Sequence, residues 1–249
     1  MIRLSGVSRS FAGRSGTVEA LRDIDLEVGD GEFVAVIGRS GCGKSTMLRL
    51  IAGLLPASTG RIRVSGETVT GPRRDIAMMF QRPALLPWRT VLDNVLLPAQ
   101  VYGWRKAAHR PRAYELLHLT GLTGFEKRMP YELSGGMQQR VALCRALIAN
   151  PRVMLMDEPF SALDALTREE LSVELQKIHM ENNATIVFVT HSIDEAVLLA
   201  DRVVVLSPRP GRIREILEIE IPRPRTLGRT EHLEKVARCS AELHELLMS

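Results

Sequence analysis

Cysteine and aromatic residues are scarce in this chain. Its 249 residues include three cysteines, and aromatic residues make up 4 % of the sequence. Three cysteines cannot build the dense disulfide framework of a small secreted domain, so we expect reduced thiols. The length suits one large domain, or one domain with a subdomain, around a substantial core.

Long hydrophobic runs are missing too. No apolar stretch approaches the roughly 18 residues that a membrane-spanning helix needs. The N-terminal residues 1–6 contain no apolar region of the kind found in signal peptides. We therefore expect a cytosolic protein without a membrane span of its own.

A strong excess of one charge is also absent. Lys and Arg number 33, Asp and Glu number 29, and the net charge is +4. This charge is too small to indicate a nucleic-acid surface. The 45 % hydrophobic and 25 % charged residues exclude a disordered chain. Arginines and prolines alternate near the C-terminus, which we interpret as a solvated, turn-rich surface; the arginines are Arg209, Arg212, Arg214, Arg223, Arg225 and Arg229.

The N-terminal third has the pattern strand, glycine loop, helix. Alternating apolar residues over 17–28 predict a half-buried strand, and the apolar run 32–37 predicts a strand buried on both faces. Glycines break the pattern at 38–43. Apolar residues then recur at helical spacing from Met47 until Pro56. A hairpin is expected around Ser65-Gly66, and a short strand over 76–80.

The middle and C-terminal parts differ in character. Prolines including Pro111 punctuate residues 82–150, where helices are expected at 113–119 and 139–149. Buried strands return at 153–156, 185–190 and 203–206. Capping boxes at 167–170 and 192–195 predict two helix starts, and 232–248 predicts a terminal helix. Alternating strands and helices indicate an α/β fold with a mostly parallel sheet and an inserted helical subdomain.

A phosphate-binding pattern follows the second strand. The segment fits G-x-x-x-x-G-K-[ST] and reads Gly38, Arg39, Ser40, Gly41, Cys42, Gly43, Lys44 and Ser45, followed by Thr46. Glycines let the backbone curl so that several N–H groups face one phosphate, and the next helix points its positive end at it. Lys44 supplies a charge for the β- and γ-phosphates, and Ser45 offers a hydroxyl ligand to Mg²⁺.

Two acids and a histidine stand at further strand ends. Asp157 and Glu158 follow the strand 153–156, where ligands bind in open α/β sheets. Asp157 can hold Mg²⁺, and Glu158 can act as general base toward water. His191 follows the strand 185–190 and can sense the γ-phosphate. Taken alone, the acids also fit a solvated loop, and the histidine also fits a surface position.

A third segment makes the pattern specific. Residues 133–140, Leu-Ser-Gly-Gly-Met-Gln-Gln-Arg, resemble the signature of ATP-binding-cassette (ABC) ATPases, with Met137 where the family usually has Gln. Residues 154–159 resemble its strand with the catalytic Glu, and 161–164, ending in Asp164, its D-loop. Gln81 resembles the Q-loop residue and His191 the switch histidine. These elements occur in family order over roughly residues 1–210.

The resemblance implies a domain organisation and a site. It implies a P-loop NTPase (RecA-like) core with an antiparallel N-terminal β subdomain in 1–81 and 151–228, a helical signature subdomain in 82–150, and a C-terminal extension in 229–249. ATP and Mg²⁺ are the implied cofactors. The implied catalytic residues are Glu158, His191 and Lys44, and Ser45, Gln81 and Asp157 are the implied metal ligands. Phe11 is the implied adenine contact.

The resemblance also implies partners. In the family two chains associate head to tail, so Ser134, Gly135, Gly136 and Gln138 of one chain would close on the ATP held by the other. A helix N-terminus preceded by such residues is a second anion cradle. Residues 80–91, 158–164 and 207–212 resemble the nitrate, sulfonate, taurine and bicarbonate importer branch. That branch implies a permease docking at Leu85, Leu86, Pro87 and Trp88, indirect service to an extracytoplasmic solute-binding protein, and a peripheral position on the cytoplasmic face of the plasma membrane.

Three other interpretations are weaker. A soluble ABC ATPase that is not coupled to transport usually carries coiled coils, zinc inserts or a second cassette, which this sequence lacks. A non-catalytic nucleotide-binding scaffold is disfavoured because Glu158 and His191 are both present. A phosphate-loop GTPase is disfavoured because no N-K-x-D segment occurs.

Overall fold

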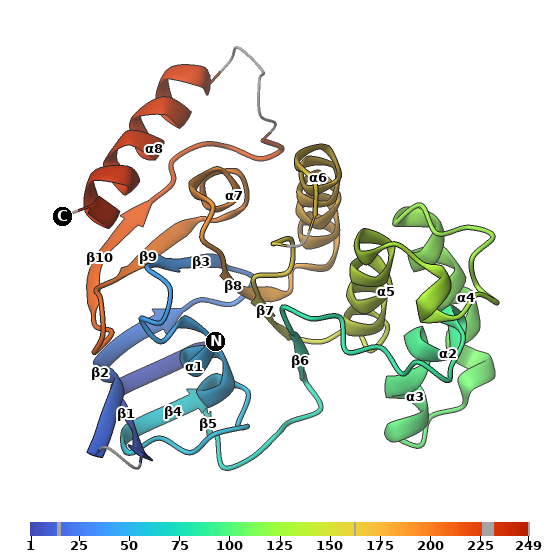
Figure 1. Cartoon of the computed structure of the whole chain (residues 1–249), viewed down its shortest axis with the longest axis horizontal. Coiled ribbons are helices and arrows are strands. Elements are labelled where there is room, and N and C mark those ends of the chain that lie inside the picture. Colours follow the sequence, from blue (N-terminus) through green and yellow to red (C-terminus); the bar gives the residue numbers. More distant parts are fainter. Residues whose placement is uncertain (14–15, 162, 226–231, 249) are drawn as a thin grey trace.

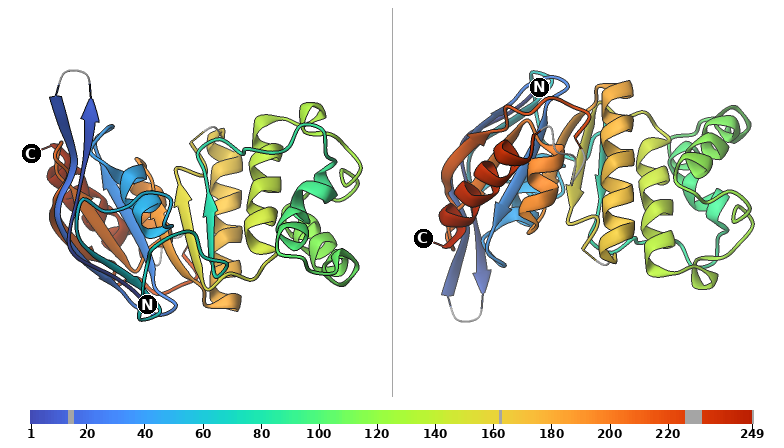
Figure 2. Two further views of the ribbon diagram at one scale, coloured as in Figure 1. Left: turned by 90° about the horizontal axis from the view of Figure 1, so that it is seen from below. Right: turned by 90° about the horizontal axis from the view of Figure 1, so that it is seen from above.

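The computed structural model describes residues 1–13, 16–161, 163–225 and 232–248 (Figure 1). Both sheets lie in one lobe with helices packed on them, and the other helices form a second, helical lobe beside it (Figures 1 and 2). Ala162 of the expected D-loop, Arg229 and the expected boundary at 228/229 lie outside the described residues. The α/β fold class expected from the sequence is confirmed by the topology of the larger sheet.

The first sheet is antiparallel. It has the order β2-β1-β4-β5, formed by β1 (Ile2–Gly13), β2 (Gly16–Val28), β4 (Thr59–Val64) and β5 (Glu67–Thr68). The expected hairpin at Ser65-Gly66 joins β4 to β5. Ile2 and Leu4 are buried while Arg3 between them is exposed, so one face of this sheet is apolar and packs inward.

The second sheet carries the strand ends that matter for the site. Its order is β10-β9-β3-β8-β7-β6, and only the pairing of β10 with β9 is antiparallel. The strands are β3 (Phe33–Gly38), β6 (Ile76–Met79), β7 (Val153–Asp157), β8 (Thr185–Val189), β9 (Arg202–Leu206) and β10 (Ile213–Glu218). Every residue of β3, β7 and β8 is buried, as the continuous apolar runs predict.

Helices cover both faces of this sheet. Helix α1 (Lys44–Ile51) lies between the two sheets, and α6 (Ala165–Asn182), α7 (Ile193–Leu199) and α8 (Leu233–Met248) cover the opposite face. The helical lobe contains α2 (Val91–Val95), α3 (Leu97–Val101), α4 (Lys106–Leu119), the 3₁₀ turn η1 (Pro130–Glu132) and α5 (Gly135–Leu147).

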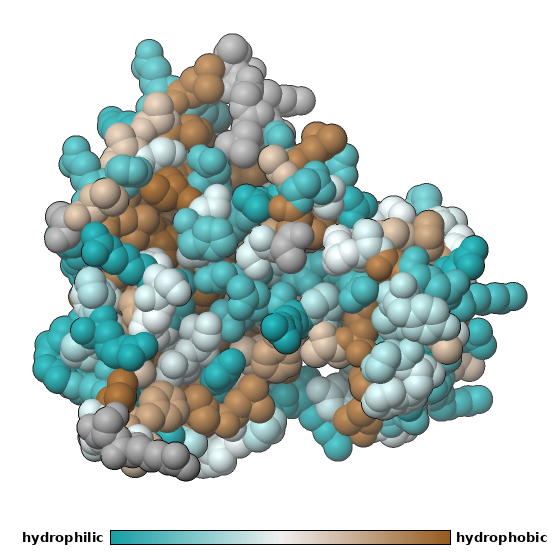
Figure 3. Space-filling view, viewed as in Figure 1, coloured by the Kyte–Doolittle hydropathy of each residue, from teal (hydrophilic) through white to brown (hydrophobic). Residues whose placement is uncertain are grey.

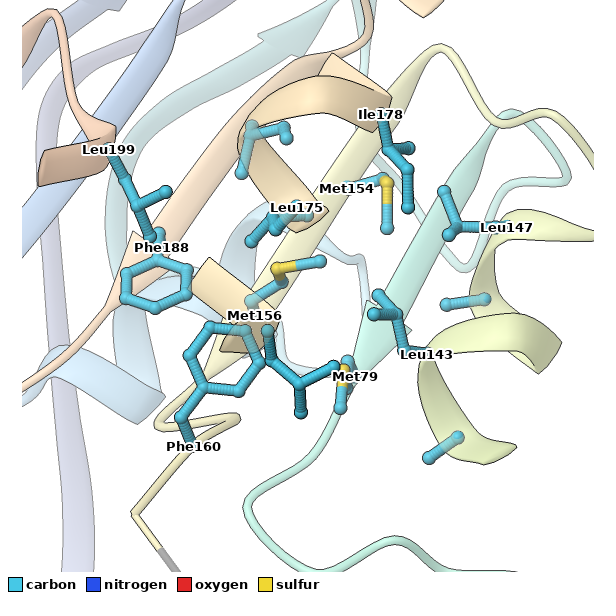
Figure 4. Close-up of a cluster of buried hydrophobic side chains, with 14 of the residues drawn as sticks. Met79, Leu143, Leu147, Met154, Met156, Phe160, Leu175, Ile178, Phe188 and Leu199 are labelled. Atoms are coloured by element: carbon cyan, nitrogen blue, oxygen red, sulfur yellow. The ribbon is translucent and has the colours of Figure 1, made fainter. Parts of the chain in front are cut away.

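A continuous core joins α5 to the sheet. Figure 4 shows Leu143 of α5 beside Met79 and Leu147 on the side of Met154, with Met156 of β7 and Leu175 of α6 in the same cluster. These side chains are buried. The helix that carries the signature segment therefore packs on β6 and shares one core with β7, the strand that carries Asp157.

The face of the helical lobe that Figure 3 shows is mainly polar. In Figure 3 the helical lobe shows mostly hydrophilic residues, with hydrophobic residues in small groups. Within the described residues, no helix combines the length and the apolar character that crossing a membrane requires.

The expected starts of α6 and α4 are wrong. The cap of α6 is Asp164, whose Oδ1 accepts the N–H of Thr167 at 3.0 Å, so the expected start at Thr167 is one turn late. An acidic residue three positions before a free N–H satisfies it equally well, and the buried Leu163 fixes the chain there. Helix α4 begins seven residues before Ala113 and contains Pro111, so this proline does not end the helix.

The C-terminal arginine segment is the largest correction. Residues 213–218 form strand β10 instead of a turn-rich surface. Arg225 is buried, and its guanidinium donates to four backbone carbonyls, those of Ile221, Val197, Ala200 and Ile219. Desolvation by burial lowers the pKa of Arg225 to about 10, and the group stays charged at neutral pH. An arginine in a proline-rich segment is buried where carbonyls from other elements converge to meet its donors.

Candidate active site

The phosphate loop connects β3 to α1 at the carboxyl edge of the sheet. Gly43 adopts φ 108°, and a Cβ there would lie 2.6 Å from Leu21 Cδ2 and 2.8 Å from the Ala20 carbonyl oxygen. Gly38 is equally confined, since a Cβ would meet Cys42 Sγ at 2.8 Å. Only glycine allows the loop to lie this close to β2. The positions that the pattern reserved for glycine are thus required by space as well as by conformation.

Lys44 is held within the loop. It is 6 % exposed, and its Nζ donates to the Gly38 carbonyl at 2.7 Å and to the Arg39 carbonyl at 3.3 Å. The Cys42 N–H also donates to the Arg39 carbonyl, at 3.2 Å. The ammonium is therefore fixed next to the N-terminus of α1, where an anion is favoured.

Ser45 and Asp157 form an oxygen pair beside the loop. The Ser45 hydroxyl donates to Asp157 Oδ1 at 2.8 Å, although the two residues are 112 positions apart. Desolvation by burial raises the pKa of Asp157, and the hydrogen bond from Ser45 opposes that rise. A hard cation such as Mg²⁺ fits two oxygen donors plus phosphate and water. Among the described residues there is no group of three or more His, Cys, Asp or Glu suited to a metal.

Glu158 stands between two polar partners at the ends of neighbouring strands. Gln81 Nε2 donates to Glu158 Oε2 at 3.2 Å, and His191 Nδ1 lies 3.5 Å from the same oxygen. The Glu158 N–H donates to the Val189 carbonyl at 2.9 Å, and the residue adopts a positive φ of 46°. A non-glycine residue in this conformation is strained, which is common at functional sites. The carboxylate is thus aimed by its backbone, with both expected sensor residues beside it.

A cavity of about 360 Å³ opens over the phosphate loop. The expected residues that line it are Phe11, Ser40, Gly41, Gly43, Lys44, Ser45, Thr46, Gln81 and Glu158. Phe11 lies on β1 with the Arg9 guanidinium 4.6 Å from its ring centre. Three further residues line the cavity that the sequence did not indicate, namely Val18, Ala20 and Arg209. Val18 and Ala20 reach it through the pairing of β2 with β1, and Arg209 left no local signal.

Three expected residues of the loop do not face the cavity. Gly38 begins the loop, Arg39 points its exposed side chain toward the C-terminus, with Nη2 3.5 Å from the Met248 carbonyl oxygen, and Cys42 is buried beneath the loop. Burial raises the pKa of the Cys42 thiol, so it acts as a small packed side chain.

The signature segment lies apart from this cavity. Ser134 caps α5, and its Oγ accepts the N–H of Met137 at 3.2 Å. The helix therefore begins at Gly135, four residues before the start of the helix expected over 139–149. Gly136 packs next to Leu163, while the Gln138 amide donates to the Pro130 carbonyl at 3.0 Å. None of the signature residues is among those that line the cavity within this chain.

Residues next to Asp164 and next to His191 are joined by a partly buried network. Arg168 donates to the carbonyl of Leu163, next to Asp164, and its Nε lies 3.5 Å from Glu195 Oε1. Glu195 accepts a short hydrogen bond from Thr190, the residue before His191. The expected cap Ser192 accepts the Glu195 N–H at 3.3 Å, but the Glu195 carboxylate turns to Thr190 instead of closing the capping box.

Comparisons with known proteins agree with this arrangement. A family model described as "ABC transporter" matches residues 21–161, more than half of the chain. The chain is 48 % identical over 233 residues to the uncharacterized ABC transporter ATP-binding protein MJ0412 of Methanocaldococcus jannaschii, covering 94 % of this chain and 87 % of the relative. It is 43 % identical to the taurine import ATP-binding protein TauB of Burkholderia thailandensis, covering 97 % and 93 %.

A further relative and a solved structure point the same way. The aliphatic sulfonates import ATP-binding protein SsuB of Bacillus cereus is 43 % identical, covering 90 % of this chain and 88 % of the relative. A dimeric post-hydrolysis structure of the ATP-binding cassette MJ0796 bound to ADP and Pi superposes with a TM-score of 0.81 at 33 % identity, covering 89 % of this chain and all of that one. The phosphate loop, the paired acids and these similarities together show that the chain belongs to the family of ABC transporter ATP-binding proteins.

Proposed function

We propose that this chain is the ATP-hydrolysing subunit of an importer for a small anionic solute of the taurine or aliphatic sulfonate kind, with nitrate and bicarbonate as further members of the same class. The observation that carries this proposal is the cavity that brings Lys44, Ser45 and Glu158 together over one phosphate loop. Relatives named for taurine and sulfonate import support the solute class.

The chain's residues divide the work of hydrolysis. Loop N–H groups and Lys44 neutralise phosphate charge, which is the main contribution to phosphoryl-transfer catalysis. Glu158 accepts a proton from the attacking water, and Gln81 and His191 hold its carboxylate in place. Ser45 and Asp157, with Gln81 joining them, would hold Mg²⁺, which supplies charge stabilisation when bound.

A second chain completes the site in this proposal. The Ser134 cap and the first turn of α5 present backbone N–H groups away from the chain's own cavity, so a head-to-tail partner can bring them to the phosphates. The helical lobe then corresponds to the signature subdomain in 82–150, the two sheets to the core in 1–81 and 151–228, and α8 to the extension. The solved MJ0796 relative is described as dimeric. ATP favours the closed pair because it binds that state better.

A rigid loop after Gln81 offers a place for the permease. Trp88 is 69 % exposed, and the loop beneath it is held by the fully buried Asn94. That side chain accepts the Leu86 N–H and donates to the carbonyls of Leu86 and Arg89. An exposed aromatic side chain on a fixed backbone is the kind of anchor that dominates binding interfaces. Docking here would hold the chain at the cytoplasmic face of the membrane, and an extracytoplasmic binding protein would act through the permease.

Co-purification tests the transport role. A tagged chain expressed with its neighbouring membrane genes is expected to recover a membrane protein in detergent. Trp88→Ala should reduce that recovery about tenfold or more, as loss of a central aromatic anchor does. Met180→Ala, which removes a 52 % exposed side chain on α6, should leave it unchanged. An active ATPase that recovers no membrane protein would instead indicate a soluble ABC ATPase.

A further inference from the structure

The loop between β9 and β10 is fixed against both β2 and the phosphate loop. Gly211 donates its N–H to the Ala20 carbonyl at 3.0 Å and accepts the N–H of Arg22 at 2.9 Å. A Cβ on Gly211 would lie 2.1 Å from the Cys42 carbonyl oxygen. The β9–β10 loop therefore lies so close to the phosphate loop that no side chain fits at Gly211. Its hydrogen bonds to β2 fix its position.

Arg209 reaches from this loop onto the apex of the phosphate loop. Its Nε and Nη2 donate to the Gly41 carbonyl at 3.2 and 3.1 Å, across 168 residues of sequence. Arg209 also lines the nucleotide cavity. Among the residues that line the cavity, Lys44 and Arg209 are the two with cationic side chains. Two donors converging on one oxygen give a directional contact that a lone ammonium cannot reproduce.

The contact bears on the direction of a backbone N–H. Gly41 adopts φ 79° and has no side chain that would limit its rotation. In a planar trans peptide the Gly41 carbonyl and the Cys42 N–H point in opposite directions. Holding the carbonyl toward Arg209 therefore turns the Cys42 N–H toward the inside of the loop, where it donates to the Arg39 carbonyl. The orientation of the loop's peptide groups decides how it receives phosphate.

We propose that Arg209 is a positioning residue of the nucleotide site, which orders the peptide between Gly41 and Cys42 for phosphate binding. The inference rests on the proposed ATP site, because it assigns a further residue to that site. Arg209 donates to the Gly41 carbonyl, whereas Glu158 accepts from Gln81, so Arg209 acts on nucleotide affinity and leaves the hydrolysis step itself to Glu158.

Nucleotide titrations of three variants test this role. Arg209→Gln should lower the affinity for both ATP and ADP by about 5- to 30-fold. This is the loss expected for charged hydrogen bonds on a partly exposed loop. The KM for ATP should rise by a similar factor while kcat at saturation stays within about twofold. Arg209→Lys should recover part of the affinity, because it keeps the charge without the fork.

Arg212→Gln is the matched control. Arg212 lies in the same loop, but its guanidinium is 3.8 Å from Asp23 and outside the cavity. We expect wild-type affinity and an unchanged thermal midpoint for this variant. Wild-type affinity in Arg209→Gln would overturn the inference, and so would equal losses in the Arg209 and Arg212 variants, which would indicate only a general effect of positive charge.

The outcome is separable from that of the proposed function. If the wild-type chain binds no ATP, the ATP site itself is refuted. If the wild type binds ATP, Lys44→Ala binds it more weakly, and Arg209→Gln binds as the wild type does, only the role of Arg209 is refuted. A drop in the thermal midpoint of Arg209→Gln that matches its loss of affinity would also overturn the positioning role in favour of a structural one.

Discussion

Replacing Glu158 by glutamine removes the proposed proton acceptor and keeps the shape of the side chain. The Glu158 side chain is 22 % exposed, and Gln81 donates to it at 3.2 Å, a contact that the amide oxygen of glutamine can still accept. Nucleotide binding by the phosphate loop should therefore persist. What is lost is proton transfer, which contributes about 10²- to 10⁴-fold to catalysis.

The expected decrease in kcat is thus about 10²- to 10⁴-fold, or about 3 to 5 kcal/mol of transition-state stabilisation. The fold should not suffer, because the neighbouring Glu158 charge is one of the causes that raise the pKa of Asp157. Removing that charge relieves a repulsion in the folded state. We therefore expect a thermal midpoint that is equal to or slightly above that of the wild type.

Phosphate release at saturating Mg-ATP, nucleotide titration and size-exclusion chromatography measure these effects together. With hydrolysis blocked, the ATP-bound pair should persist and elute as a dimer. Glu181→Gln, an exposed acid on α6, is the control and should keep wild-type turnover. Unchanged phosphate release by Glu158→Gln would refute its role as general base, and a variant that stays monomeric with ATP would contradict the two-chain site.

Three further substitutions test other parts of the site and the fold. Lys44→Ala should weaken ATP binding by about 10- to 100-fold, since charged hydrogen bonds are lost; calorimetric affinity equal to that of the wild type would be contrary. Asp157→Asn should lower Mg²⁺-dependent turnover yet raise the thermal midpoint at pH 7, because burial raises the pKa of Asp157 and makes its charged form costly in the folded state. Since the folded state then binds this proton more tightly, wild-type stability falls as pH rises through that pKa, so the advantage of the variant should shrink in melts at lower pH. Arg225→Met should destabilise the fold by about 3 kcal/mol or more, because buried carbonyls lose their donor, and a wild-type urea midpoint would contradict this.

Local sequence patterns were sufficient to predict the phosphate loop, the strand before it and the acids after β7. The run before Gly38 predicts a buried strand, and the Gly43 and Lys44 spacing predicts a loop and a helix, because adjacent residues alone decide backbone curvature and charge there. The acids after β7 could also be placed at a strand end from sequence. The confirmed family membership rests on the same local segments, including the one around Ser134.

Contacts between distant segments could not be predicted in this way. Val18 and Ala20 line the cavity beside Phe11 only because β2 pairs with β1, and β10 forms only because β9 offers it an edge. The cap of α6 was misplaced because Asp164 and Thr167 are equally good capping residues by type, and the tertiary fixing of Leu163 decides between them.

The sequence by itself therefore determined the phosphate loop, the acids and the fold class, because each depends on a few neighbouring residues. Only the tertiary structure decided that Arg225 is buried and that Arg209 holds Gly41, since both arginines come from one proline-rich segment that looks solvated throughout. The fate of an arginine depends on which carbonyls converge on it, and those carbonyls belong to residues far away in the chain.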